Sequence, residues 1–477
     1  MKHLQCLMLC LAAAPVFSEE QRTGPNILFI MADDLSAEAL GCYGNEQVQT
    51  PNIDRLAARG TVMDRAYCQY PVCGPARAAL LSGQYPQQNR VTGNSDRDIL
   101  STSLGDHPTL PQYLKDNGYR TVRLGKLYHM RVPGHITAGI SGPDHPASWT
   151  EAHNFQAPEQ WTPGRSYRLC NTPLKPDPER NIHYNLGYGP AFFVVEDPTG
   201  GSAQHDVKAT DKAIELLQND LKEKPFFLAV GYVRPHVPLV APKPFYELYN
   251  ADEIEVPTFP NGDRLDIPKS GISLVGERRG LDTLKKRQQT LLAYYASVSF
   301  MDAQVGRLLD ELDKQGLAEN TIVFFMSDHG YHLGEHDFWQ KMSLHEESAR
   351  IPLIAAGPLI KPGSRWEGLV EAIDLYPTLC LMLGLPIPEG CSGTQLYGTE
   401  DGDQETAYTF KGNGHLLRTK DWAYMRYKDG SEELYDMTRD PKQFTNLAKD
   451  AASAASLGKV RALLDAKLKQ ITGEADR

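Results

Sequence analysis

The sequence predicts an α/β protein in which a large, mostly parallel β-sheet lies between helices, followed by a smaller C-terminal α+β subdomain. Three observations support this prediction. Apolar runs without alternation are typical of strands buried on both faces, and amphipathic segments separate these runs. Short strands with a hairpin turn follow near the C-terminus. With 477 residues, the chain is long enough for one large domain and an appendage.

Each expected strand of the large sheet is an apolar run that ends in charged or histidine side chains. Three such runs cover residues 25–34, 224–236 and 320–330. A further strand is predicted at 119–126. In open α/β sheets, ligands bind just beyond the carboxyl ends of the strands. The polar side chains at these ends therefore predict one shared site.

Amphipathic helices are predicted from apolar residues at three-to-four spacing, and the alternation of strand and helix indicates a layered α/β domain. These helices cover residues 109–118, 206–223, 286–316 and 374–388, the last with a turn. Two segments rich in proline, glycine and polar residues are expected to be long loops over the ligand crevice that carry specificity: 131–205 and 240–285.

The C-terminal part has a different character. Short strands are predicted in 415–441 around the hairpin signal Lys428-Asp429-Gly430, and a helix is predicted at 454–470. We therefore expect three parts: a signal peptide at residues 1–18, a catalytic domain at 19–396 and a C-terminal subdomain at 397–477.

The N-terminal segment "MKHLQCLMLCLAAAPVFS" has a basic start, an apolar centre and small residues at Val16 and Ser18. This pattern is typical of a secretory signal peptide and is too short to span a membrane. A lipid anchor on Cys10 is the alternative. We expect an exported protein, periplasmic, extracellular or lysosomal, with no membrane span.

The net charge and the cysteine content limit the classes of binding partner and of fold that we expect. The formal net charge is −11, and loss of Lys2 with the signal peptide makes the chain more acidic. Such a chain is not expected to bind nucleic acid, and an anionic substrate would need a local basic pocket. Of the eight cysteines, the six that would remain after removal of the signal peptide are too few for a disulfide scaffold in a chain of this length. Cys380 and Cys391 form a plausible pair.

Asp33, Asp34 and Asp328 follow two of the predicted strands and would supply three carboxylates to one hard cation, such as calcium or magnesium. The alternative is that they cap helices or lie in solvated turns. A zinc site is the second alternative, from the histidines at 329, 332, 336 and 345. The acid-rich ligand set disfavours zinc.

The stretch "YPVCGPARAALLSG" at residues 70–83 is predicted to be a turn that opens into a helix. Taken alone, Cys73 is either a disulfide partner, with Cys68 near at hand, or a nucleophilic thiol. The Cys-Gly-Pro-Ala-Arg spacing resembles the signature of type I sulfatases, in which the cysteine is oxidised to formylglycine during export. The resemblance implies that a formylglycine-generating maturation enzyme reads Pro75 and Arg77 and converts Cys73.

The resemblance covers nearly all of the mature chain, and it is strongest for the iduronate-2-sulfatase branch, in which histidine follows the later metal acid. It implies an alkaline-phosphatase-like sulfatase core and one calcium ion per chain. The segments that carry it, besides the cysteine motif, are residues 33–60, 124–129, 226–239, 294–309 and 327–341.

The family's roles transfer to matching positions. The implied metal ligands are Asp33, Asp34, Asp328 and His329, together with the formylglycine derived from Cys73. Arg77 would hold the formylglycine hydrate. Lys126 and His129 would lie beside the aldehyde and the sulfate, and His236 and Lys341 on the leaving-group side. One hydroxyl of the hydrate would attack sulfur, with His236 as general acid and His129 receiving a proton as sulfate leaves.

The resemblance implies an exported sulfatase acting on a sulfated oligosaccharide or polysaccharide, with a 2-O-sulfated uronic acid at a chain end as the expected target. Two other hypotheses remain open. One is a phosphodiesterase or phosphonate monoester hydrolase of the same superfamily. The other is a non-catalytic glycan-binding protein in which Cys73 stays a thiol or pairs with Cys68.

Overall fold

A nine-stranded sheet forms the centre of the molecule in a computed structural model, with strand order β14-β2-β15-β11-β1-β9-β3-β4 and β16 paired with β2. The structure describes residues 24–94, 99–169, 174–177, 182–185, 192–221, 224–396, 404–412 and 414–473. The predicted signal peptide and Cys170 lie outside the described residues.

Four parallel strands form the middle of this sheet and confirm the predicted runs. They are β1 (Asn26–Asp33), β3 (Arg120–Gly125), β9 (Phe226–Pro235) and β11 (Thr321–Ser327). β1 pairs with β11 on one side and with β9 on the other, and β9 pairs with β3. Every residue of β1, β9 and β11 is buried. Their carboxyl ends therefore meet at the same edge of the sheet.

The outer strands make the sheet mixed. Strand β15 pairs antiparallel with both β11 and β2, and β14 also pairs antiparallel with β2. The pairs of β16 with β2 and of β4 with β3 are parallel. The bounds are β2 (Gly60–Tyr67), β4 (Glu151–His153), β14 (Arg350–Ile351), β15 (Leu353–Ala356) and β16 (Ser364–Glu371).

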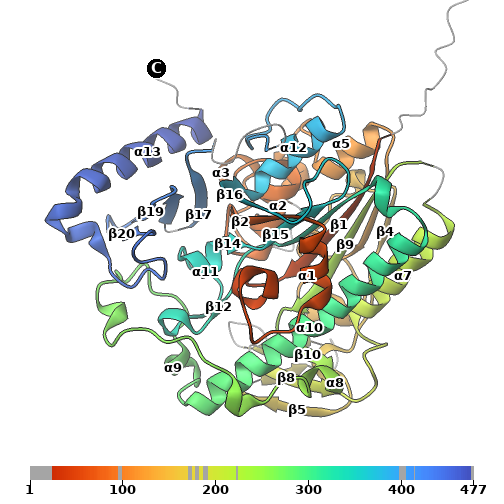
Figure 1. Cartoon of the computed structure of the whole chain (residues 1–477), viewed down its shortest axis with the longest axis horizontal. Helices are drawn as coiled ribbons and strands as arrows, with labels where there is room; N and C mark the ends of the chain where they lie inside the picture. Colours follow the sequence, from red (N-terminus) through yellow and green to blue (C-terminus); the bar gives the residue numbers. More distant parts are fainter. Residues whose placement is uncertain are drawn as a thin grey trace, which may run out of the picture.

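Helices cover both faces of the sheet (Figure 1). Leu28 and Ile30 of β1 belong to one core cluster, shared with α1, α7 and α10. Phe29 and Met31 point to the other face and belong to a second cluster, shared with α2, α5 and α12. The bounds are α1 (Pro51–Ala58), α2 (Cys73–Ser82), α5 (Leu110–Asp116), α7 (His205–Asn219), α10 (Leu284–Lys314) and α12 (Leu375–Met382).

The expected long loops contain more regular structure than predicted. A three-stranded sheet, ordered β10-β8-β5, lies within them and pairs residues far apart in sequence. Its strands are β5 (Arg165–Arg168), β8 (Phe193–Asp197) and β10 (Leu239–Pro242). Other short elements there are β6 (Leu174–Asp177), β7 (Ile182–Asn185), α6 (Gly134–Ala138), α8 (Lys243–Tyr246) and α9 (Gly276–Arg279). Strands of four or five residues carry too little pattern to separate them from turns.

A four-stranded antiparallel sheet near the C-terminus confirms the predicted change of character, and it lies beside β2 and β16 (Figure 1). Its strands are β17 (Ala407–Lys411), β18 (Gly414–Arg418), β19 (Trp422–Tyr427) and β20 (Glu432–Asp436), and α13 (Ala454–Thr472) packs against them. The hairpin at Gly430 has φ 84°. The domain boundary at 397 stays a prediction.

The main domain also contains five short helices and strands, besides single-turn 3-10 helices: α3 (Pro86–Asn89), α4 (Leu100–Ser103), β12 (His332–Leu333), β13 (Trp339–Gln340) and α11 (Glu346–Ala349). Cys380 and Cys391, considered above as a pair, are both free thiols that pack against the second core cluster, as Cys68 does. Within the described part of the chain, no helix has the length and apolarity to cross a bilayer.

Candidate active site

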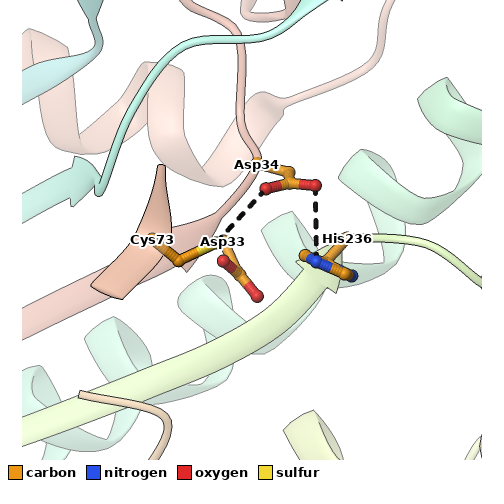
Figure 2. A group of neighbouring side chains, drawn as sticks. All are labelled: Asp33, Asp34, Cys73 and His236. Carbon is orange, nitrogen blue, oxygen red and sulfur yellow. Dashed lines mark hydrogen bonds and ion pairs between the residues drawn. The ribbon is translucent and has the colours of Figure 1, made fainter. Parts of the chain in front are cut away.

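The predicted site residues come together at the carboxyl edge of the sheet. Asp33 ends β1 and Asp34 follows it, Asp328 and His329 follow β11, and His236 follows β9. Lys126 and His129 follow β3, Lys341 follows β13, and Cys73 begins α2 beyond the end of β2. Figure 2 shows Asp33, Asp34, Cys73 and His236 facing one another.

Cys73 is the first residue of α2 and is only 1% exposed. Val72 before it is extended, Pro75 lies in the first turn, where no helical N–H bond is lost, and Gly83 ends the helix with φ 66°. This confirms the predicted turn into a helix. Burial raises the pKa of the Cys73 thiol well above its usual value. As a thiol, Cys73 is therefore a poor nucleophile.

The three carboxylates are buried, and hydrogen bonds hold the backbone at Asp34 in place. Asp34 has φ 67°, which is unusual for a residue with a side chain. The hydroxyl of Tyr294 on α10 donates to the Asp34 carbonyl at 2.6 Å and accepts from the Ser36 N–H at 2.9 Å. The Asp34 N–H donates to Asp328 Oδ1 at 3.3 Å. These contacts hold Asp34 in its strained conformation.

Three cations balance the three carboxylates. Arg77 Nε lies 2.8 Å from Asp328 Oδ2, and Arg77 also contacts Asp33 Oδ1 at 3.3 Å. Lys126 pairs with Asp33, and Lys341 pairs with Asp34. Burial alone would raise the pKa of Asp33, but Lys126, His236 and Arg77 hold it well below its usual value. Burial would raise the pKa of Asp34 as well, but His236 and Lys341 lower it below its usual value, and both Asp33 and Asp34 are therefore ionised near neutral pH.

His329 directs its ring nitrogen Nε2 toward the carboxylates. Its Nδ1 lies 2.8 Å from the Gly330 carbonyl, which can only accept, so Nδ1 carries the hydrogen. Its Nε2 lies 3.3 Å from Asp34 Oδ1, 3.7 Å from Asp328 Oδ1 and 3.3 Å from Cys73 Sγ. A cation bound among these atoms would have Nε2 and both carboxylates as ligands.

The donor set fits a hard divalent cation. Two overlapping groups have ligand atoms within 4.8 Å of one another: Asp33, Asp34, Cys73 and His236, and Asp33, Cys73, Asp328 and His329. Carboxylate oxygens suit calcium or magnesium.

Of the four histidines of the alternative zinc cluster, His329 belongs to one of these groups, whereas His332, His336 and His345 belong to neither among the described residues. His336 instead contacts Asp263 at 2.8 Å, and His345 contacts Glu433 at 3.1 Å. Both ring nitrogens of His345 have hydrogen-bond partners, whereas those of His332 and Nε2 of His336 have none among the described residues. Because His332, His336 and His345 do not gather with His329 in one ligand group, the structure does not support the zinc alternative.

Two further histidines flank the carboxylates. His236 lies with Nε2 3.6 Å from Asp34 Oδ2, and its Nδ1 contacts the Val237 carbonyl at 2.5 Å. Burial lowers the pKa of His236 to about 4. Burial, and then the charge of Lys126, lower the pKa of His129 well below its usual value. Both imidazoles are therefore neutral at pH 7 before a substrate binds.

Sequence reasoning missed two supporting residues. Tyr294 fixes Asp34 but sits in a long amphipathic helix, where a tyrosine looks like an ordinary core residue. Glu159 binds Arg234 through both carboxylate oxygens at 2.7 and 2.6 Å, and Arg234 in turn donates to the His236 carbonyl at 2.8 Å. Glu159 lies in the expected loop 131–205 and carries no motif that could have identified it.

Family models match the chain in two regions. The model described as "Sulfatase" matches residues 25–385, and the model described as "N-sulphoglucosamine sulphohydrolase, C-terminal" matches residues 334–473. The iduronate 2-sulfatase of Homo sapiens is 34% identical over 408 residues, which cover 77% of this chain and 70% of that protein.

Two solved structures have a similar fold. One is a protein in complex with its substrate D-glucosamine-2-N,6-O-disulfate, with TM-score 0.72 and 24% identity, covering 94% of this chain and 98% of the other. The other is a phosphonate monoester hydrolase of Agrobacterium radiobacter, with TM-score 0.72 and 21% identity, covering 94% of this chain and 96% of the other. At these identities the likeness establishes the fold alone, and it agrees with the predicted sulfatase-type core.

Proposed function

The chain belongs to the sulfatase family, and we propose that it is an exported, calcium-dependent sulfatase that removes the 2-O-sulfate of a uronic acid in a sulfated saccharide. Its relatives support sulfuric ester hydrolysis as the reaction. The iduronate 2-sulfatase of Homo sapiens is the relative that favours a 2-O-sulfated uronic acid as substrate.

The observation that carries the proposal is the charge balance around Cys73. Three carboxylates and three cations lie within one buried cluster, so a divalent cation would leave it with a net positive charge. A chain with net charge −11 needs such a local field to attract a sulfate ester. A cation held by Asp33, Asp34, Asp328 and His329 would neutralise charge on the sulfuryl oxygens.

Position 73 is proposed to act as formylglycine, made by a separate maturation enzyme. Its hydrate would supply one hydroxyl that attacks sulfur and a second whose deprotonation releases sulfate. Arg77, one turn after Cys73 on α2, would hold that hydrate, and its contacts with Asp33 and Asp328 support this role. Lys341 Nζ, 3.2 Å from Cys73 Sγ, would meet a sulfuryl oxygen.

The two histidines take the proton-transfer roles in this proposal. His236 would protonate the departing sugar oxygen from Nε2, while the Val237 carbonyl fixes its Nδ1. Its pKa of about 4 rises when an anionic ester lies beside it. The Nδ1 of His129 is buried and has no hydrogen-bond partner among the described residues. His129 can therefore accept a proton as sulfate leaves.

Desulfation assays on defined substrates test this function. We expect the matured, calcium-loaded protein to act on a 2-O-sulfated uronic acid saccharide in preference to 4- or 6-sulfated saccharides, and to become inactive on chelation until calcium is returned. A phosphodiester and a phosphonate monoester belong in the same panel, because a phosphonate monoester hydrolase shares the fold. Preference for either phosphorus substrate would contradict the sulfatase assignment, and preference for a 6-sulfated hexosamine would contradict the uronate assignment.

The role of His236 predicts a dependence on the leaving group. His236→Gln is expected to slow hydrolysis of a sugar sulfate by roughly 100- to 10,000-fold, because an alkoxide leaves poorly without a proton. An aryl sulfate should be slowed far less, since a phenolate leaves unassisted. His415→Gln is the matched control, because burial also lowers the pKa of His415 to about 4, but it lies on β18. Equal slowing of both ester classes would exclude His236 as the acid.

A further inference from the structure

The segment that carries Lys341 is conformationally strained. His336, Asp337, Gln340 and Met342 all have positive φ, at 54°, 58°, 69° and 77°. Such conformations cost free energy in residues with side chains and persist only where the surroundings hold them. The contacts that hold this segment therefore decide where the Lys341 ammonium lies.

The part before Lys341 is held by the main domain. Asp337 accepts from Arg264 at 2.6 Å and from Arg287 of α10 at 2.7 Å. His336 Nδ1 lies 2.8 Å from Asp263 Oδ2. These contacts fix the chain up to β13, immediately before Lys341.

The part after Lys341 is held by the C-terminal sheet. His345 Nε2 lies 3.1 Å from Glu433 Oε2 on β20, and both side chains are fully buried. His345 Nδ1 contacts Ser343 Oγ at 2.7 Å, and the same Oγ accepts from the His345 N–H at 2.9 Å. Since the Glu433 carboxylate only accepts, Nε2 carries the hydrogen. Glu433 therefore orients His345, whose Nδ1 and backbone N–H both contact Ser343 Oγ, two residues after Lys341.

Glu433 also contacts a second segment that lies beside Lys341, residues 271–273. Gly271 packs so closely on it that a Cβ there would lie 2.2 Å from Glu433 Oε1. Ser273, two residues later, donates to the Lys341 carbonyl at 3.4 Å. One carboxylate thus underlies both segments that flank the lysine.

Glu433 is itself fully partnered. The hydroxyl of Tyr427 donates to Oε1 at 2.5 Å, and the hydroxyl of Tyr435 donates to Oε2. Burial alone would raise the pKa of Glu433, but His345 and these hydroxyls hold it below its usual value. The group that supports the lysine segment is therefore a buried, ionised and rigid carboxylate.

We propose that Glu433 of the C-terminal sheet is a positioning residue for Lys341, acting through His345 and through the Gly271–Ser273 segment. The C-terminal sheet would then help to position a side chain of the active site. The positioning stands on the contacts above, whereas its effect on turnover rests on the proposed function.

The positioning itself is tested on the unmatured chain, without any assay of activity. In Glu433→Gln, we expect amide hydrogen exchange at residues 341–345 and amine labelling of Lys341, read by mass spectrometry, to accelerate by roughly tenfold or more. Glu371→Gln is the matched control, a buried carboxylate that accepts from Tyr85 at 2.7 Å and Lys467 at 3.1 Å. Exchange that rises equally in both variants, in step with lost stability, would overturn the proposal.

The catalytic consequence is tested by a double-mutant cycle on the matured, calcium-loaded protein. Glu433→Gln is expected to lower kcat by roughly 10- to 100-fold with little change in KM, and to have almost no further effect in a Lys341→Met background. The same loss in both backgrounds would show a general structural role and overturn the proposal. Should Glu433→Gln fail to fold, His345→Ala makes the same test, and His345→Gln, whose amide can still donate to Glu433, should restore kcat. Inactive wild-type protein would contradict the proposed function but leave the exchange result valid.

Discussion

Replacing Cys73 by alanine is expected to lower sulfate release by roughly 10,000-fold or more, with the fold intact. Alanine keeps the Cβ that would become the aldehyde carbon but lacks the thiol that maturation oxidises. It fits at the start of α2, where the contacts of the thiol are to Asp34 at 3.9 Å, His329 at 3.3 Å and Lys341 at 3.2 Å. The measurement is the rate of sulfate release by wild-type and variant protein, each produced together with a formylglycine-generating enzyme.

Cys68→Ala is the matched control, because Cys68 is also buried and free but lies before the motif. It should retain activity. The mass of the tryptic peptide Ala66–Arg77 shows whether the CH2SH group at position 73 has become CHO. Activity from a chain whose peptide keeps the thiol would contradict the proposed nucleophile. A chain that carries the aldehyde and binds sulfated glycans, yet never releases sulfate, would favour the glycan-binding alternative.

Replacing Arg77 by methionine is expected to lower the free energy of unfolding by about 3–5 kcal/mol in the absence of metal. Arg77, Asp33 and Asp328 have side chains with no exposed surface, so the variant leaves two buried carboxylates without one of their partners. Urea unfolding measures the loss. Calcium should return part of the stability, because a divalent cation compensates the same carboxylates.

The control is Arg365→Met, which removes an exposed ion pair with Asp64. Arg365 has 49% of its side chain exposed, so we expect a loss of less than about 1 kcal/mol. Equal losses in the two variants would show that the buried pairs of Arg77 contribute no more than a surface pair.

The central strands could be predicted because burial on both faces leaves a continuous apolar run that ends abruptly in polar residues. This is how β1, β9 and β11 were found, and with them Asp33, His236 and Asp328. The small β10-β8-β5 sheet was missed because its strands are short and pair residues that are distant in sequence. The pairing of Cys380 with Cys391 was a guess from proximity in sequence, and both are free.

The supports of the site could not be predicted. Tyr294 and Glu433 act through a single hydrogen bond or ion pair to a residue far away in the chain, and no local pattern records such a partner. The sequence also could not show that His329 presents its Nε2 to the carboxylates, because the Gly330 carbonyl that fixes the tautomer becomes a partner only in the folded turn.

The amino-acid sequence alone determined the fold class and the family resemblance and predicted the candidate site residues, because apolar periodicity and the cysteine motif are local properties of the chain. Only the tertiary structure decided how the charges balance around Cys73 and which contacts hold Lys341. These depend on distances between residues hundreds of positions apart, such as Asp34 and Lys341. Electrostatic free energy depends on separation in space and on burial, and folding alone sets both.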